Sequence, residues 1–370
     1  MSRKITTKKS AVNFFSADVE YRGIGIDIAK KFLSVCTIDS DGCVEYIARM
    51  SRDELIEQLA PFKPIPIVME PCAGSAFLAE RIEKIGHKPY LVSGSAVKAA
   101  VQAQCNGQKN DRNDAYAMAK MACDPDYLHR IIPKQAKQRQ LALLLTQRDL
   151  YVGCQTKIVN SLKGRLLEAG IEINKTGLNA EELAKKLPDD PFIQQMVTTD
   201  LAVLKELAEK IAELKGLIEN LLSKMPETQY LKTIPGFGSI VVAAFIAVII
   251  DPERFKRGNS LCAYIGLVPR DMSSGGKTRL GRMSKRGNRY LRKMMVIAGM
   301  ALMKMVVAKN SKVPDCRLRD WVLNQMKKHG NGKISLKSAV ACGCKLVRIA
   351  LSILKSESTF DWMKAGVSNR

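Results

Sequence analysis

Four acidic residues lie at positions where the chain could build a carboxylate site. Asp27 stands in an apolar, strand-like segment, and Glu70 ends another such segment just before Pro71. Asp111 and Asp114 are three residues apart in a helical stretch, so both project from one face. Carboxylates that share a face repel one another unless a divalent cation lies between them. The four acids therefore predict a magnesium site, in which two ions about 3.5–4 Å apart would clamp the attacking and leaving oxygens of a phosphodiester.

Each acid also has an ordinary structural interpretation. Asp111 or Asp114 could cap a helix, Glu70 could end a strand, and Asp27 could be a salt-bridged core acid. For any one residue taken alone, the structural interpretation is favoured. The combination of all four favours the magnesium site.

A serine beside two glycines is the second candidate for chemistry. Ser274 precedes a glycine pair and Lys277. A nucleotide-binding P-loop is excluded, because its pattern requires glycine where Asp271 stands. A serine that can approach a phosphate closely among cations can act as a nucleophile, whereas a loop serine is more often a turn former. Ser273 is adjacent, so the choice between Ser273 and Ser274 stays open.

Residues 273–293, the basic segment, hold eight Lys and Arg side chains and no acidic one. A phosphate backbone is the partner that fits such a segment best, and a solvated basic face is the alternative. Its cations are predicted to bind nucleic acid: Lys277, Arg279, Arg282, Lys285, Arg286, Arg289, Arg292 and Lys293.

The chain as a whole is strongly basic. Its 370 residues include 59 Lys and Arg against 36 Asp and Glu, which gives a formal net charge of +23 and a pI near 9.6. Residues 20–126 hold 13 basic and 15 acidic side chains, a net charge of −2 that leaves +25 for the rest. The charge predicts a polyanionic partner, held mainly outside residues 20–126.

Composition also excludes several classes of protein. The longest apolar run, residues 240–250, is shorter than the roughly 20 residues of a membrane span, and residues 1–10 lack the apolar core of a signal peptide. The ten cysteines contain no C-x-x-C pair, and there are only three histidines, which argues against a zinc hydrolase or a tyrosine recombinase. We expect a cytoplasmic protein of the bacterial cytosol or nucleoid, with reduced thiols and no membrane contact.

Alternating apolar residues predict a three-stranded meander over residues 23–28, 32–38 and 43–50. A polar–apolar stretch follows at 51–60, and then strands and helices alternate: strands at 65–70 and 89–92, and helices near 75–85, 95–104 and 110–123. This order predicts a mixed-sheet α/β domain over residues 20–132, preceded by a basic tail at 1–19.

Residues 133–226 show helical patterns with a break at 187–191. The second stretch carries heptads typical of a coiled coil that joins subunits, but a helix packed on its own hairpin partner explains them equally well. The repeating positions are Leu204, Ile211, Ile218 and Met225, with Leu207, Leu214 and Leu221.

Residues 227–370 are expected to form a mainly helical C-terminal domain that contains the basic segment. The sequence Ile-Pro-Gly-Phe-Gly at 234–238 resembles the hairpin of helix-hairpin-helix modules, whose glycine amides contact phosphates. Gly236 and Gly238 are therefore candidate phosphate contacts. A helix break made by proline and glycine accounts for the same residues equally well.

These motifs together resemble one family. Gly25 to Lys30, Met69-Glu70-Pro71 and Lys109 to Ala115 look like the N-terminal domain of the DEDD transposases of the insertion sequence one-ten family, which is similar to the RuvC junction resolvase and has a ribonuclease-H-like fold. The segments 234–238, 264–269, 274–277 and 284–292 look like that family's C-terminal transposase domain. The matches run from about residue 22 to 300 and keep the family's order.

The resemblance implies a DNA recombinase that cuts and rejoins strands of an insertion element and its target. It implies that Ser274 is a covalent nucleophile toward DNA, working with Asp27, Glu70, Asp111, Asp114 and Mg²⁺. It also implies guidance by a structured RNA. We expect a homo-oligomer, a dimer or tetramer, in which the active site is shared between subunits.

Two other functions fit part of the sequence. A RuvC-like Holliday-junction endonuclease would use the four acids with water and leave Ser274 dispensable. A non-enzymatic nucleic-acid-binding scaffold would need none of the acids, and their presence at all four positions argues against it.

Overall fold

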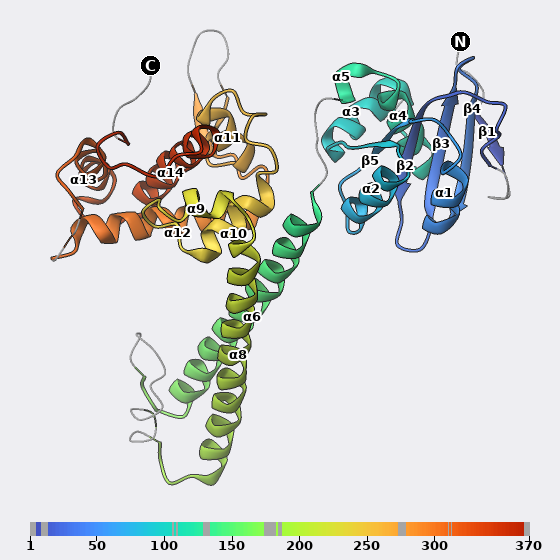
Figure 1. Ribbon diagram of the computed structural model, residues 1–370. Helices are drawn as coiled ribbons and strands as arrows, with labels where there is room; N and C mark the ends of the chain where they lie inside the picture. Colours follow the sequence, from blue (N-terminus) through green and yellow to red (C-terminus); the bar gives the residue numbers. More distant parts are fainter. Residues whose placement is uncertain are drawn as a thin grey trace. The chain divides into compact units, whose positions relative to one another are not determined.

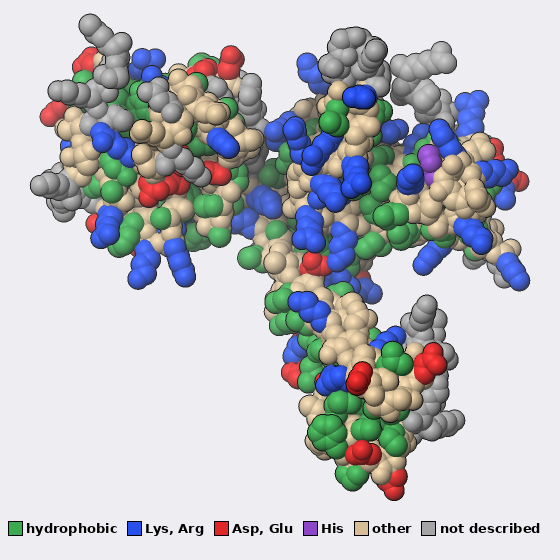
Figure 2. Space-filling view, turned by 180° about the vertical axis from the view of Figure 1, so that it is seen from behind, with side chains coloured by type: hydrophobic (Ala, Val, Ile, Leu, Met, Phe, Trp, Pro, Cys, Tyr) green, Lys and Arg blue, Asp and Glu red, His purple; other side chains and the backbone are tan. Residues whose placement is uncertain are grey.

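The protein consists of two compact units, residues Met1–Ala136 and Lys137–Arg370, in the computed structural model (Figure 1). The structure describes residues 5–8, 14–105, 107–108, 110–128, 134–173, 183, 187–272, 279–309, 311 and 313–365. The first unit has 19 Lys and Arg against 16 Asp and Glu, and the second has 40 against 20. Blue side chains accordingly cover much of the second unit in Figure 2.

The first unit is a mixed α/β domain with a six-stranded sheet of order β1-β4-β3-β2-β5-β6. The strands β2, β3 and β4 form the predicted antiparallel meander, while β5 and β6 run parallel to β2. Its elements are β1 (Ile5–Lys8), β2 (Tyr21–Ile28), β3 (Leu33–Asp39), β4 (Val44–Met50), α1 (Arg52–Leu59), β5 (Pro66–Met69), α2 (Ser75–Lys84), β6 (Lys88–Leu91), α3 (Gly94–Gln104), α4 (Asp111–Ala122) and α5 (Pro125–Leu128).

Helices cover both faces of this sheet. Ile67 and Met69 of β5 pack in one core cluster with residues of α1 and α2, such as Leu78. Val68, between them, faces the opposite way and packs with α3 and α4 residues such as Met118. The alternation has the period of two that a strand imposes. Burial on both faces explains why β5 is a continuous apolar run.

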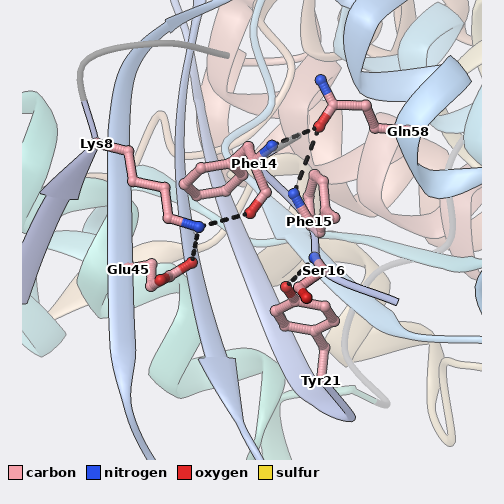
Figure 3. A network of polar contacts seen from close by, with 7 residues as sticks. All are labelled: Lys8, Phe14, Phe15, Ser16, Tyr21, Glu45 and Gln58. Atoms are coloured by element: carbon pink, nitrogen blue, oxygen red, sulfur yellow. Dashed lines mark hydrogen bonds and ion pairs between the residues drawn. The ribbon is translucent and has the colours of Figure 1, made fainter. Parts of the chain in front are cut away.

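Part of the N-terminal segment expected to be a basic tail belongs to the fold. The strand β1 pairs in parallel with β4, and Lys8 Nζ lies 2.7 Å from Glu45 Oε2 and donates to Phe14 O (Figure 3). Phe14 is fully buried, and Gln58 Oε1 accepts hydrogen bonds from its backbone N–H and from that of Phe15. The basic composition of this segment did not indicate that Phe14 and Phe15 are buried in the core.

The described part of the second unit is helical apart from one small hairpin of strands. Its elements are α6 (Ala136–Glu168), α8 (Pro191–Ser223), α9 (Glu227–Leu231), α10 (Ser239–Val248), α11 (Gly258–Ile265), β7 (Pro269–Asp271), β8 (Leu280–Met283), α12 (Arg289–Val307), α13 (Arg317–Gly330) and α14 (Leu336–Ser356). The two-stranded antiparallel hairpin β7–β8 was not predicted.

The helices α6 and α8 form a long antiparallel hairpin (Figure 1). At one end Lys137 Nζ donates to Lys224 O at 3.2 Å, and farther along Arg165 pairs with Asp200. Heptad residues Leu214 and Ile218 of α8 are buried. A partner within the chain therefore covers at least part of the predicted heptad stripe.

The base of this hairpin enters the main core of the second unit. Leu145 and Ile218 belong to the same buried cluster as Phe245 of α10, Met295 of α12 and Val347 of α14. The small residues Gly299 and Gly343 let α12 and α14 pack closely, because a Cβ on Gly299 would lie 2.3 Å from Ala339 O. These helices form the framework for the basic segment.

No helix among the described residues is long and apolar enough to cross a membrane. All ten cysteines are free thiols. Burial raises the pKa of Cys36 and that of Cys342 to about 12, so both thiols are protonated at neutral pH.

Candidate active site

The helix α4, which carries Asp111 and Asp114, lies directly against the strand β2, which carries Asp27. Gly23 and Gly25 of β2 allow this close approach. A Cβ on Gly25 would lie 2.0 Å from Ala115 O and 2.2 Å from Ala119 N, so any side chain there would push the helix away. Two strand glycines thus position the helix that carries half of the predicted acids.

The start of α4 is held by side-chain hydrogen bonds. The N-cap residue Asn110 accepts from the Asn113 N–H at 2.8 Å, and Asn113 Nδ2 donates to Gln108 O at 2.7 Å. Asp111 is exposed, whereas Asp114 is only 8% exposed. Both carboxylates lie in the first helical turn, where the helix dipole favours negative charge.

Glu70 follows the last residue of β5 and borders a cavity of about 190 Å³. Asp114 lines the same cavity, together with Gly94, Lys98 and Gln102. A Cβ on Gly94 would lie 2.2 Å from Glu70 Oε1, so the carboxylate occupies space that only glycine leaves free. Sequence reasoning identified both acids but not Gly94, Lys98 or the cavity.

Together with burial, the negative charges of the acids raise the pKa values of two neighbouring side chains, Tyr46 and Cys72. Burial raises the pKa of Tyr46, and the negative charges of Asp111 and Asp27 add to that rise. Burial also raises the pKa of Cys72, with contributions from Asp27 and Glu70. Beyond the effect of burial, the charge of Asp27 therefore raises the pKa of Tyr46 together with Asp111, and the pKa of Cys72 together with Glu70. Glu70 also shares a cavity with Asp114.

Of the four acids, the structure brings Glu70 and Asp114 to one cavity. Among the described residues, no three His, Cys, Asp or Glu side chains lie close enough together to hold a metal ion as they stand. The donor chemistry nevertheless fits Mg²⁺, because all four groups are carboxylates and this ion prefers oxygen ligands.

In the second unit, the hairpin β7–β8 brackets the predicted serine. Ser273, Ser274 and Lys277 lie outside the described residues. The hairpin closes just before and after them, where Met272 N donates to Arg279 O at 2.8 Å. The serine and its glycine pair therefore belong to the connection between two paired strands.

Several cations of the basic segment beyond the serine have exposed side chains. Arg282, Lys285, Arg286 and Arg289 are exposed, as is Arg279. These five side chains lie on the surface of the second unit, where a phosphate backbone could reach them.

Arg292 and Lys293 hold the unit together instead. The Nη1 atom of Arg292 donates to Ile265 O at 3.0 Å and to Arg286 O at 2.8 Å, while Lys293 Nζ lies 2.7 Å from Asp149 on α6. Gly287 packs so tightly that a Cβ would lie 2.0 Å from Tyr264 O. These contacts give part of the basic segment a structural role.

The two glycines of the 234–238 motif differ in their surroundings. Gly236 has φ +83°, and a Cβ there would lie 2.6 Å from Ala298 O on α12, so packing alone requires this glycine. Gly238 is the N-cap of α10 and has open space around it. Phosphate contact by either residue stays a prediction.

Two models of transposase families match separate parts of the chain. Residues 24–171 match the model of a transposase family designated by DEDD and IS110, and residues 228–313 match the family described as "Transposase IS116/IS110/IS902 family". Together the two matches include the acids and the basic segment.

Curated relatives extend the similarity over most of the chain. The transposase for insertion sequence element IS1111A of Coxiella burnetii is 31% identical, over 78% of this chain and 80% of its own length. The transposase for insertion sequence element IS1328 of Yersinia enterocolitica is 29% identical over 91% and 98%, and a probable family 20 transposase of Pseudomonas aeruginosa is 27% identical over 91% and 98%.

Proposed function

The chain belongs to the IS110 family of insertion-sequence transposases, and from that premise we propose that it cuts and rejoins DNA with the acids of its first unit and a serine of its second. The observation that supports the proposal is the cavity that Glu70 and Asp114 line together, beside the close packing of α4, which carries Asp111, on β2, which carries Asp27. Carboxylates that border an open cavity are candidates for chemistry on a phosphodiester.

In this proposal the four carboxylates hold magnesium, two ions in the complete site. When bound, the metal would stabilise the negative charge that develops on the phosphodiester oxygens. The chain supplies the rest of the environment. Gly94 leaves room for Glu70, and Lys98 on the cavity wall would neutralise charge on a phosphate placed there.

Ser274 is the proposed nucleophile, with Ser273 as the alternative. Its Oγ would attack phosphorus, forming an O–P bond to the protein while a bridging P–O bond of the DNA strand breaks and leaves a deoxyribose hydroxyl. Attack by a hydroxyl of another strand would reverse the step and release the serine. The exposed Arg282, Lys285 and Arg286 nearby in sequence support binding of the phosphates on either side.

A guide RNA and a homo-oligomer complete the proposal. The excess of 20 positive charges on the second unit supports a nucleic-acid partner. The outer surface of the α6–α8 hairpin supports contact with a second copy as a coiled coil. Leu143 and Leu150 of α6 are seven residues apart and 71% and 61% exposed, which is the spacing of an interhelical seam. A site shared between subunits would bring the acids of one copy to the serine of another.

The acid site is tested by strand cleavage. Full-length protein with its co-purifying RNA and Mg²⁺ is incubated with labelled element-junction and target DNA. We expect Asp27→Asn and Glu70→Gln each to lower cleavage by roughly 100-fold or more, equivalent to several kcal/mol of transition-state stabilisation. Glu57→Gln, an exposed acid of α1 in the same unit, is the matched control and should leave cleavage unchanged. Full activity in the Asp27 and Glu70 variants would contradict the proposal.

A further inference from the structure

A second acid-free basic stretch lies beyond the regions that match the family models. Between Trp321 and Ser356 the chain has seven Lys and Arg and no Asp or Glu. The matched regions end at residue 313.

Four lysines of this stretch form one exposed cluster, which we term the cationic turn. Lys327 and Lys328 lie in the last turn of α13, Lys333 lies in the connection, and Lys337 lies in the first turn of α14. All four side chains are exposed, and no described acidic side chain pairs with any of them. Lys and Arg side chains gather over this end of the second unit in Figure 2.

The backbone of the cationic turn is firmly built. Asn331 and Gly332 both adopt positive φ, at 48° and 81°, and Gly332 N donates to Met326 O at 3.2 Å. Ser335 and Ser338 form a reciprocal capping box at the start of α14. The lysines are therefore presented by a defined scaffold, which lowers the entropy lost on binding.

The two helices that flank the cationic turn, α13 and α14, are also held in place by packing. The buried Met326 and Ser338 anchor the end of α13 and the start of α14, and Lys345 of α14 lies 5.8 Å from the ring centroid of Trp321 on α13. The positive end of the α14 dipole points into the same turn. This positive end adds to the charge of the lysines, whereas the end of α13 contributes the negative end of its own dipole.

Two large apolar side chains are exposed among these cations. Ile334 is 38% exposed and Leu336 is 66% exposed, and both lie between Lys333 and Lys337 in the sequence. Proteins that bind the grooves of DNA often place apolar side chains against bases while neighbouring cations contact phosphates.

We propose that the cationic turn binds the sugar–phosphate backbone of duplex DNA, with Ile334 and Leu336 lying against the adjacent groove. The site is separate in sequence from the basic segment around the serine, and it would hold DNA without cutting it. The inference rests on the proposed function, because it takes DNA to be the substrate. Charge complementarity and the turn's rigid presentation favour a duplex backbone over a protein partner.

The test is the salt dependence of duplex binding by the full-length protein, measured by fluorescence anisotropy. The variant Lys328→Ala/Lys333→Ala removes two cations from the turn. The matched control, Lys63→Ala/Lys88→Ala, removes two exposed lysines of the first unit. We expect the slope of log affinity against log salt concentration to fall by about 2 in magnitude in the first variant and to stay unchanged in the control.

Leu336→Ser supplies a second readout. It removes apolar contact but no charge, so we expect a several-fold loss of duplex affinity with an unchanged salt slope. An RNA duplex of the same sequence is measured in parallel.

Three results would overturn the inference. Equal slopes in wild type and the Lys328/Lys333 variant would show that the turn does not contact phosphates. A slope change seen only with the RNA duplex would identify RNA as the partner. A change in oligomeric state without a change in slope would indicate a protein interface. Wild-type protein that binds no duplex DNA at all would defeat the proposed function as well, whereas the first three results would leave it standing.

Discussion

Gly94 decides how much room the Glu70 carboxylate has. An added Cβ would lie 2.2 Å from Glu70 Oε1, and the atom that must move is the end of a flexible side chain. The backbone of Gly94 lies at the start of α3 without a positive φ, so alanine itself is compatible with the helix. The site and the stability of the fold can therefore be separated at this residue.

We expect Gly94→Ala to lower DNA cleavage by about 10- to 100-fold, because displacement of a positioned group by about 1 Å has that effect. The free energy of unfolding should change by less than about 1 kcal/mol. The measurement pairs a cleavage assay with urea unfolding followed by circular dichroism.

Gly216→Ala is the control for adding a methyl group to a glycine. It lies in α8 with open space around it, and the change should stabilise the helix by about 0.5–1 kcal/mol without affecting cleavage. A Gly94→Ala protein as active as wild type would show that the Glu70 carboxylate can work from another position.

At the scale of single residues, sequence reasoning could propose the acids from their residue type and their positions at strand ends and on one helix face, and their role stays a prediction. It could not name Gly25 or Gly94, because the reason for each glycine is an atom far away in the chain: Ala115 O for the first and Glu70 Oε1 for the second. For Ser274 the motif remains the whole argument, since that residue lies outside the described part of the chain.

Secondary-structure elements with a strong hydrophobic period were predicted well. The strands β2 to β6 and the helices α2 to α4 begin and end within a few residues of the expected positions. The strands β1, β7 and β8 were missed because they are three or four residues long and lack a continuous apolar run like that of β5. Such strands form because neighbouring structure pairs with them, a cause that local sequence does not reveal.

The N-terminal element provides a stability prediction. Phe14 is fully buried, and its ring centroid lies 5.1 Å from that of Phe15 in an edge-on arrangement. We expect Phe14→Ala to lower the free energy of unfolding of the first unit by about 3–5 kcal/mol, the usual range for removing a buried phenylalanine. Hydrogen exchange of the β2 amides, measured at increasing urea concentrations, gives this free energy of unfolding.

Phe77→Ala is the control within the same unit, because Phe77 of α2 is 56% exposed. Its loss should change stability by less than about 1 kcal/mol. Equal effects of the two substitutions would mean that the Phe14 side chain adds no more to the core than the exposed Phe77 does.

On the scale of the whole molecule, charge and chemistry are divided between the units. The predicted acids lie in a unit with nearly balanced charge, and the predicted serine and most of the basic excess lie in the other. The heptads of α8 predicted a buried stripe but not the partner that buries it, because an intramolecular hairpin and an intermolecular coiled coil cover the same positions. Sequence alone could therefore predict the parts but not their assembly.

The central claim is that the serine and the acids of separate units act in one reaction. The most direct measurement is a denaturing gel that detects a covalent protein–DNA adduct, formed by full-length protein with Mg²⁺ and labelled junction DNA. Wild type, Ser273→Ala, Ser274→Ala and Asp27→Asn are compared. Our account predicts an adduct in wild type and Ser273→Ala that is absent from Ser274→Ala and Asp27→Asn. Cleavage without an adduct that survives in Ser274→Ala and is lost in Asp27→Asn would contradict it and identify a hydrolytic nuclease.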